Sequence, residues 1–250
     1  METAWFRFYE ELNDFMPPHR QKVAFRHCFN GRNSVKDMIE SLGVPHTEID
    51  LILVNSESVD FSYIVRDGDR VSVYPVFECF DISPLVRLRP RPLRVSRFIL
   101  DVHLGRLARY LRLFGFDTYY RNDYDDAEIA EIASRERRIL LTRDLGLLKR
   151  SQVTHGYFVR ATNPHQQLAE VLDRMDLRRS LRPFKRCMRC NALLAPVAKE
   201  AIVERLEPDT RRYFDQFWMC AGCEQIYWKG SHYLRMRRLV DRLLEQSASV

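Results

Sequence analysis

The sequence has no apolar run long enough to cross a membrane, and its first residues do not have the pattern of a signal peptide. It contains no stretch of about 18 apolar residues. The opening METAWFRFYEELND has no basic region followed by an apolar run. We therefore expect a cytosolic protein with no membrane partner. In that reducing compartment its six cysteines are expected to be free or metal-bound, because disulfides are rare there.

What the chain does have is an uneven distribution of charge. Residues 1–83 contain 8 Lys and Arg against 14 Asp and Glu, whereas residues 84–250 contain 32 against 20. A basic half favours an anionic partner, most simply nucleic acid, although a solvated surface would show the same balance. At 250 residues and 46% hydrophobic content, the chain is long enough for two or three small domains with real cores.

Residues 1–83 alternate between strand and helix patterns. Ser34 is a plausible helix N-cap, Gly43 lies beyond the end of that helix, and Asp67-Gly68-Asp69 predicts a tight turn. Four segments have the alternation or apolar content of strands: TAWFRFY, QKVAFRHCF, IDLILVN and DRVSVYPVF. The order strand, strand, helix, strand, strand predicts an α+β domain of β-grasp type. Cys28 and Cys79 fall in its predicted strands, where we expect small buried side chains.

This first domain also resembles a known group. VPHTEIDLILVNSESVDFSYIVRDGDRVSVYPVF is similar to the ubiquitin-like domains related to the small sulfur carriers of thiamine and molybdopterin synthesis. Those carriers act through a C-terminal Gly-Gly, whereas here the strand ends in Phe77-Glu78-Cys79-Phe80 and the chain continues. The carrier chemistry therefore does not transfer, and we expect a docking or regulatory module with a protein partner.

A proline- and arginine-rich stretch follows. Residues 84–97, PLVRLRPRPLRVSR, carry three prolines and five arginines. Proline removes backbone donors and favours extended chain, so this stretch predicts a semi-rigid basic linker. Its arginines could touch phosphates or serve only to keep the linker soluble.

Residues 98–180 have the rhythm of an α/β domain. Short apolar strands are predicted at RFILD, DTYYR, RILLT and GYFVR. Helical patterns lie between and after them: one from Leu104 to Phe114 that Gly115 ends, one over DDAEIAEIASRE, and one from Asn163 or Pro164 through Met175. This alternation predicts a parallel sheet with helices on both faces.

Residues 181–250 contain two C-x-x-C pairs and a basic C-terminal helix, SHYLRMRRLVDRLLEQ. One such pair alone could be redox-active, whereas two can present four thiolates to a tetrahedral zinc ion. The 29 residues between the pairs exceed the spacing of compact fingers, so we expect an inserted helix or hairpin. The pattern predicts a zinc ribbon with a structural site formed by Cys187, Cys190, Cys220 and Cys223.

Acidic residues gather where the predicted parallel strands end. Asp101 ends the first strand, Asp126 opens the helix after the second, and Asp144 follows the third. Ligands of open α/β sheets bind at the carboxyl ends of the strands. Clustered carboxylates repel one another unless a cation such as Mg²⁺ or Mn²⁺ joins them, and such a metal can activate water for phosphodiester cleavage. Candidate contacts to the substrate backbone are Arg106, Arg109, Thr142 and Arg143.

Each acid also has a purely structural explanation, because Asp is a favoured helix N-cap. Asp125 with Glu128 has the pattern of a capping-box variant, and Asp144 could cap a short helix over LGLLKR. Taken singly, these residues favour caps. Three of them at one sheet edge favour a metal site.

The whole second half resembles one family. FILDVHLGRLARYLRLFGFDTYYRNDYDDAEIAEIASRERRILLTRDLGLLKR is similar to the PIN-like ribonuclease domain first defined at the C-terminus of the Mut-seven exonuclease. The likeness continues through the cysteine pairs and QIYWKGSHYLRM, and an N-terminal β-grasp domain accompanies bacterial members. The resemblance implies metal-dependent RNA cleavage, with the family's acidic positions on Asp101, Asp126 and Asp144.

One position departs from the family pattern. Many relatives carry a further acid two residues after the position of Asp144, where this chain has Gly146. The departure leaves open one metal rather than two, or another ligand such as Glu128. It also keeps two alternatives to a ribonuclease: a non-catalytic RNA-binding adaptor, and a protein-interaction scaffold built around the ubiquitin-like domain.

Overall fold

The structure is a computed structural model that describes residues 1–75, 88 and 96–245. The described residues form two compact units, one within the ranges Met1–Val95 and Tyr124–Val159 and the other within Ser96–Asp123 and Arg160–Val250. Cys79 and most of the predicted linker 84–97 lie outside the described residues. Among the described helices, none combines the length and apolar character needed to span a bilayer.

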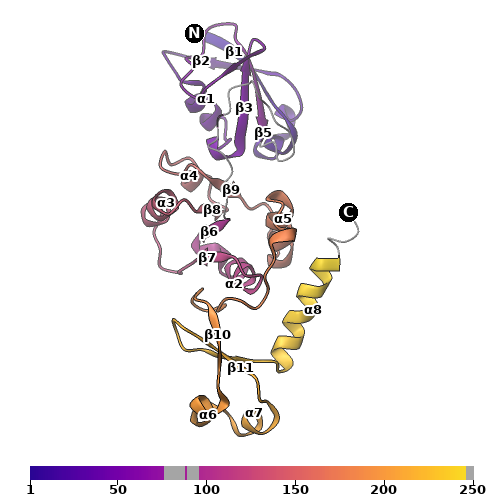
Figure 1. Cartoon of the computed structure of the whole chain (residues 1–250). Coiled ribbons are helices and arrows are strands. Elements are labelled where there is room, and N and C mark those ends of the chain that lie inside the picture. Colours follow the sequence, from indigo (N-terminus) through magenta and orange to yellow (C-terminus); the bar gives the residue numbers. More distant parts are fainter. Residues whose placement is uncertain (76–87, 89–95, 246–250) are drawn as a thin grey trace. The chain divides into compact units, whose positions relative to one another are not determined.

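The first part of the chain forms a mixed five-stranded sheet in the order β2-β1-β5-β3-β4 (Figure 1). The parallel pairing of β1 with β5, beside the antiparallel pairing of β1 with β2, confirms the predicted β-grasp topology. The strands are β1 (Glu2–Phe8), β2 (Phe25–Phe29), β3 (Ile49–Val54), β4 (Glu57–Val59) and β5 (Arg70–Pro75). The helices are η1 (Glu10–Phe15), η2 (Pro18–Arg20), α1 (Val35–Ser41) and η3 (His46–Glu48).

Helix α1 begins and ends as its sequence predicts. The Asp37 backbone N–H donates to the Ser34 hydroxyl at 3.1 Å, which caps the N-terminus of the helix. Gly43, beyond its end, has a φ of +110°, at which a residue with an L side chain would be strained. The apolar face of α1 carries Val35, Met38 and Ile39, all of which belong to the buried core of this sheet.

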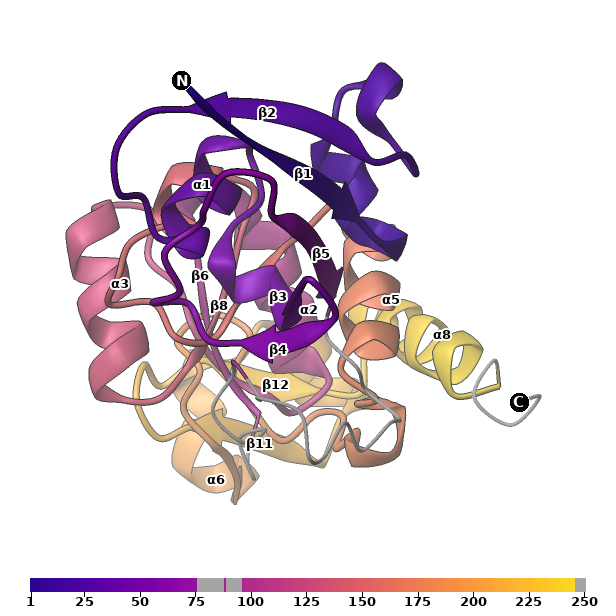
Figure 2. The same ribbon diagram turned by 90° about the horizontal axis from the view of Figure 1, so that it is seen from above.

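The prediction for Cys28 was wrong in one respect. Cys28 lies in strand β2 as expected, but its side chain is exposed. The reason is position in the sheet, because β2 is an edge strand and its side chains alternate between the core and solvent (Figure 2).

The first unit also contains the segment α3 (Asp126–Arg135), β8 (Ile139–Thr142), α4 (Leu145–Leu148) and β9 (Gly156–Phe158). This segment is hydrogen-bonded to the end of the β-grasp domain. Glu48 Oε1 accepts from the Phe158 backbone N–H at 2.7 Å, and His46 Nε2 lies 3.0 Å from the Val153 carbonyl oxygen. Lys149 Nζ donates to the Glu40 carbonyl at 2.5 Å. Glu48 is only 1% exposed, so its carboxylate is a built-in part of this contact.

The second unit begins with β6 (Arg97–Leu100), η4 (Val102–Leu104), α2 (Gly105–Leu113) and β7 (Asp117–Tyr119). It continues with α5 (Pro164–Arg174) and η5 (Arg178–Ser180). Strands β6 and β7 pair in parallel, and in the first unit β8 and β9 also pair in parallel. The predicted parallel α/β domain is therefore present.

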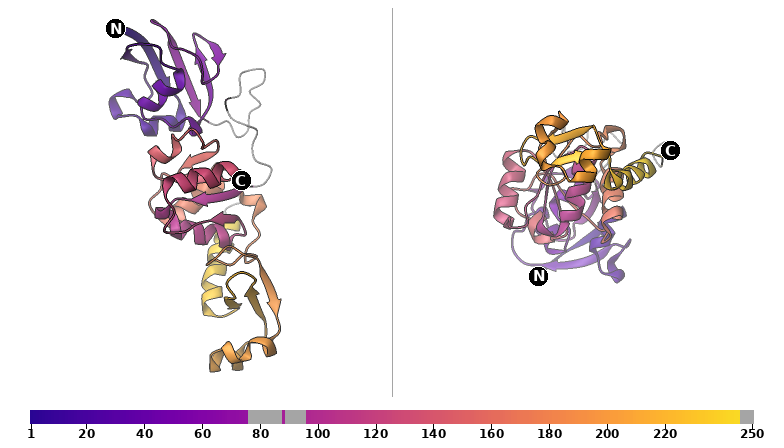
Figure 3. Two further views of the ribbon diagram at one scale, coloured as in Figure 1. Left: turned by 90° about the vertical axis from the view of Figure 1, so that its left-hand side faces the viewer. Right: turned by 90° about the horizontal axis from the view of Figure 1, so that it is seen from below.

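The C-terminal part forms the predicted ribbon. Its antiparallel sheet consists of β10 (Leu194–Val197), β11 (Phe217–Cys220) and β12 (Ile226–Trp228). The long insertion between the cysteine pairs is helical, with α6 (Lys199–Ile202), η6 (Val203–Arg205) and α7 (Pro208–Tyr213). Helix α8 (Ser231–Glu245) follows; the ribbon and α8 are the orange and yellow elements of Figure 3.

Candidate functional site

The four cysteines of the two C-x-x-C pairs come together in the structure. Their sulfur atoms all lie within 4.8 Å of one another, with Cys187 Sγ 3.6 Å from Cys223 Sγ and Cys190 Sγ 3.2 Å from Cys220 Sγ. A tetrahedral zinc ion with bonds of about 2.3 Å would separate its sulfur ligands by about 3.8 Å. The backbone N–H groups of Gly222 and Cys223 point at Cys220 Sγ at 3.3 and 3.4 Å. The donor set therefore fits a metal ion.

The thiols differ in their readiness to ionise. Burial acts to raise the pKa of Cys187, but hydrogen bonds from the Tyr227 hydroxyl and from the backbone N–H groups of Cys190 and Arg189 outweigh it and lower the pKa to about 7. Burial raises the pKa of Cys190 to about 12, and the neighbouring thiols add to that rise. Four thiolates so close together need a cation, since a bound metal stabilises the deprotonated form of every ligand.

A buried arginine holds the first cysteine pair in place. Arg112 of α2 is 3% exposed, and its Nη1 donates to the Arg189 carbonyl at 2.8 Å and to the Met188 carbonyl at 3.3 Å. Its Nε donates to the Thr118 carbonyl in β7 at 2.9 Å. The planar guanidinium can serve these acceptors at once, so it connects α2, β7 and the turn between Cys187 and Cys190. This role was not predicted from the sequence.

Asn191, directly after the first cysteine pair, makes a second connection to β7. Its Oδ1 accepts from the Thr118 backbone N–H and its Nδ2 donates to Asp117 Oδ1, both at 2.9 Å. Asn191 has a φ of +75°, a conformation that asparagine tolerates better than most residues. The sequence could have indicated that Arg112 is buried, because it stands four residues after Ala108 on the apolar face of α2. No pattern in the sequence indicated the role of Asn191.

Asp101, predicted as a metal ligand, directly follows β6 and is 4% exposed. It is the N-cap of η4, but its side chain accepts no capping hydrogen bond from that helix. Its carbonyl accepts from the Leu104 backbone N–H at 2.9 Å. The main chain of Asp101 therefore starts the helix, and the carboxylate is not used for the cap.

Asp126 and Glu128 lie in the first turn of α3. The predicted N-cap of α3 is present at Asp125, whose Oδ1 accepts a hydrogen bond from the Glu128 backbone N–H at 2.8 Å. Asp126 is therefore not the cap, and its carboxylate is exposed, with Arg150 Nη2 4.0 Å from its Oδ2. Glu128 is half-buried.

Asp144 caps α4, as one of the two sequence interpretations predicts. Its Oδ1 accepts from the Gly146 backbone N–H at 2.6 Å, and its own N–H donates to the Thr142 hydroxyl at 2.8 Å. Its side chain is exposed. Arg143 Nη1 donates to the Val159 carbonyl at 2.8 Å, so this predicted phosphate contact also has a structural bond.

The two remaining predicted substrate contacts lie on the outer face of α2. Arg106 and Arg109 are exposed and line a pocket of about 460 Å³. Val102, the residue after Asp101, lines the same pocket. Within the residues that the structure describes, the cysteines form the one group of three or more His, Cys, Asp or Glu side chains with ligand atoms close enough to hold a metal. The three aspartates therefore remain predicted ligands.

Comparison with known families agrees with the resemblance seen in the sequence. A family model described as Mut7-C RNAse domain matches residues 96–240, which is more than half of the chain. A second family model, described as Mut7-C ubiquitin, matches residues 1–81. No curated protein and no solved structure matches the chain.

Proposed function

Because the chain belongs to the Mut7-C RNAse domain family, we propose that it is a metal-dependent ribonuclease that hydrolyses RNA phosphodiester bonds. The observation that carries this proposal is the placement of its acids. Asp101 directly follows β6, Asp144 comes two residues after the end of β8, and Asp126 opens α3, the helix after β7; all three strands pair in parallel. Strand ends of this kind are where α/β proteins bind their ligands.

In this proposal Asp101, Asp126 and Asp144 hold Mg²⁺ or Mn²⁺, with Glu128 as a further ligand. The metal would activate the attacking water and stabilise the leaving oxygen. Capping and metal binding are compatible at Asp144, since the cap engages Oδ1 and the exposed carboxylate has a second oxygen. Arg106, Arg109, Arg143 and Thr142 would bind the phosphates around the scissile bond.

We assign the four-cysteine centre to a structural Zn²⁺. A closed set of four thiolates leaves no open position for substrate, which is typical of structural rather than catalytic zinc. The basic residues around the ribbon and on α8 would add RNA affinity through the release of counterions. The ubiquitin-like domain would contact a protein partner.

The decisive experiment replaces Asp144 with Asn in the full-length chain. Asn caps a helix about as well as Asp, so the fold around α4 is retained while the negative metal ligand is lost. We expect Mn²⁺-dependent cleavage of a mixed RNA by the natural protein and a fall of at least about a hundredfold in the variant, typical of the loss of a catalytic group. Asp209→Asn, an exposed residue of α7 with the same charge change, is the matched control and should cleave normally.

Unchanged cleavage by Asp144→Asn would contradict the catalytic assignment. RNA binding without any cleavage, in the natural protein as well, would support the second candidate, a non-catalytic RNA-binding adaptor. Gly146 favours that candidate, because it stands where many relatives carry another acid. Absence of both binding and cleavage would leave the protein-interaction scaffold.

A further inference from the structure

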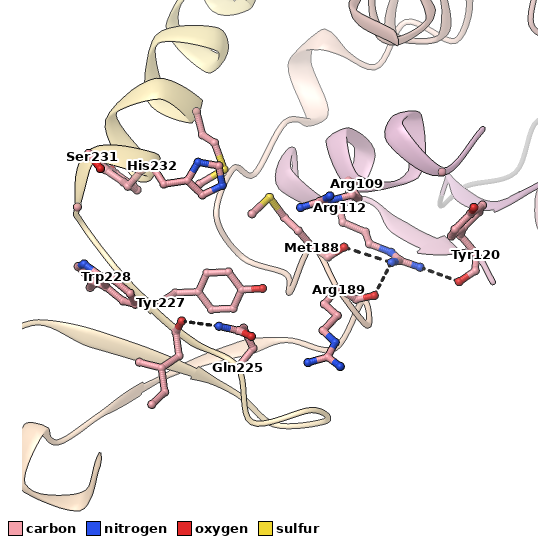
Figure 4. A pocket seen from close by; sticks show the side chains of 15 residues that line it. Arg109, Arg112, Tyr120, Met188, Arg189, Gln225, Tyr227, Trp228, Ser231 and His232 are labelled. Carbon is pink, nitrogen blue, oxygen red and sulfur yellow. Dashed lines mark hydrogen bonds between the residues drawn. The ribbon is translucent and has the colours of Figure 1, made fainter. Parts of the chain in front are cut away.

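A second pocket, of about 570 Å³, lies where α2, the first cysteine pair and the start of α8 meet (Figure 4). Its volume is within the range of roughly 300–1,000 Å³ that is common for small-ligand sites. All the elements that line it belong to the second unit. The residues on which its chemistry depends are Arg109, Arg189, Tyr227, Trp228, His232 and Tyr233.

The walls of this pocket are fixed by bonds already described. Arg112 holds the carbonyls of Met188 and Arg189, so the loop that carries the Arg189 side chain is anchored. The Tyr227 hydroxyl lies 3.1 Å from Cys187 Sγ, which ties the aromatic ring to the cysteine centre. A Cβ on Gly230 would fall 2.7 Å from Trp228 Nε1, so the chain passes close against the indole. A pocket fixed before binding loses little freedom when a ligand enters.

The pocket combines cations at its rim with aromatic faces. Arg109, Arg189 and His232 have exposed side chains, and none of the described residues that line the pocket is acidic. Figure 4 shows the Tyr227 ring projecting into the space between His232 and Gln225. Sites for single-stranded nucleic acid have this composition, with bases stacked on aromatic side chains and a positive surface along the backbone.

This pocket shares a wall with the pocket of about 460 Å³ that Arg106 and Val102 line, next to Asp101 in the chain. Gly105, Arg109 and Tyr120 line both. The Tyr120 hydroxyl donates to the Val102 carbonyl at 3.0 Å, which fixes the ring beside the end of β6. A Cβ on Gly105 would fall 2.5 Å from the Tyr120 hydroxyl oxygen, so only glycine lets the ring take this place. A positively charged path therefore leads from the ribbon toward Asp101.

We propose that the pocket beside the cysteine ribbon binds one unpaired base of a single-stranded RNA. Arg189 and Arg109 bind the phosphates on either side of that base, and Arg109 passes the strand on to the pocket of Arg106. The inference rests on the proposed function in taking RNA as the ligand. It adds that the ribbon recognises a base as well as the backbone, which makes unpaired RNA the substrate class.

The test compares two labelled probes of equal length: a single-stranded oligouridylate, and the same ribose-phosphate chain without bases. Binding is measured by fluorescence anisotropy on the full chain carrying Asp144→Asn, without a chelator so that the cysteine centre keeps its metal. We expect the base-bearing probe to bind about tenfold more tightly, which is the low end of what one stacked base contributes. Adding His232→Ala, which removes an exposed aromatic ring that lines the pocket, should reduce that preference to about twofold or less.

The control pair is Arg235→Ala with Arg238→Ala on the exposed side of α8. It removes more positive charge than the pocket variant, so it should weaken both probes and leave the preference for bases intact. Equal binding of the two probes by the parent chain, or an equal loss of preference in the control, would overturn the base pocket. Cleavage is measured separately on the chain with Asp144 intact, so an inactive protein that prefers bases would reject the ribonuclease and keep the pocket. Arg189→Ala, which removes a proposed phosphate contact, should weaken both probes alike and leave the preference for bases intact.

Discussion

The ubiquitin-like domain and the cysteine ribbon differ in the size of their hydrophobic cores. The domain buries a continuous hydrophobic core that extends from Ala4 in β1 to Val73 in β5. In the part of the ribbon that the structure describes, the hydrophobic cluster has four buried members, Ile202, Leu206, Phe217 and Ile226, with partly buried side chains packed against them. Small modules with so little apolar burial usually need a metal or disulfides to fold. The difference predicts a domain held together by side-chain packing and a ribbon held together by a metal ion bound to its four cysteines.

The largest test of this difference is removal of the metal. We expect Cys220→Ser, or a strong chelator, to unfold the ribbon, because binding of structural zinc supplies about 10–16 kcal/mol to such modules. The β-grasp strands should keep their slow amide exchange. Hydrogen exchange followed by mass spectrometry measures both regions at once. Cys28→Ser is the matched control, since Cys28 is exposed and outside the centre. Slow exchange in β11 after the metal is removed would argue against a metal-held ribbon.

The converse test weakens the packed domain. Ile52 of β3 is fully buried, and Ile52→Ala should lower the free energy of unfolding of the β-grasp domain by about 2–5 kcal/mol. Bound zinc, measured by elemental analysis, should not change. Val23→Ala, at a position 47% exposed, removes apolar atoms without opening a cavity and should cost less than about 0.5 kcal/mol. Loss of zinc in Ile52→Ala would show that the two modules do not fold separately.

A smaller effect is expected at the bonds between the ribbon and α2. Arg112→Lys keeps the positive charge, but a lysine cannot donate hydrogen bonds to carbonyls on both β7 and the cysteine turn. The buried carbonyls left without a donor should lower the free energy of unfolding by about 1–3 kcal/mol. We expect faster transfer of zinc to a chromogenic chelator. Arg109→Lys, three residues earlier and exposed, is the control. Equal transfer rates in the two variants would indicate that Arg112 does not support the centre.

Local chemistry explains why so much of the fold was predictable. The Ser34 cap, the Asp125 cap and the Gly43 and Gly115 helix ends depend on residues within a few positions of one another. The insertion between the cysteine pairs was expected only in outline, as a helix or a hairpin, because the length of the segment was the only indication of it. Cys28 was misassigned because alternation predicts which residues share a face, and the position of the strand in the sheet decides whether that face is covered.

The sequence by itself determined the cysteine centre, since two residues between paired thiols place both on one turn. The sequence also identified the acids that follow the strands, and the family to which the chain belongs. Only the tertiary structure decided that Arg112 holds the turn of the first cysteine pair, and that α2, β12 and α8 enclose a pocket. The physical reason is distance along the chain. Arg112 and Arg189 are 77 residues apart, and no local rule of spacing or propensity relates residues so far apart.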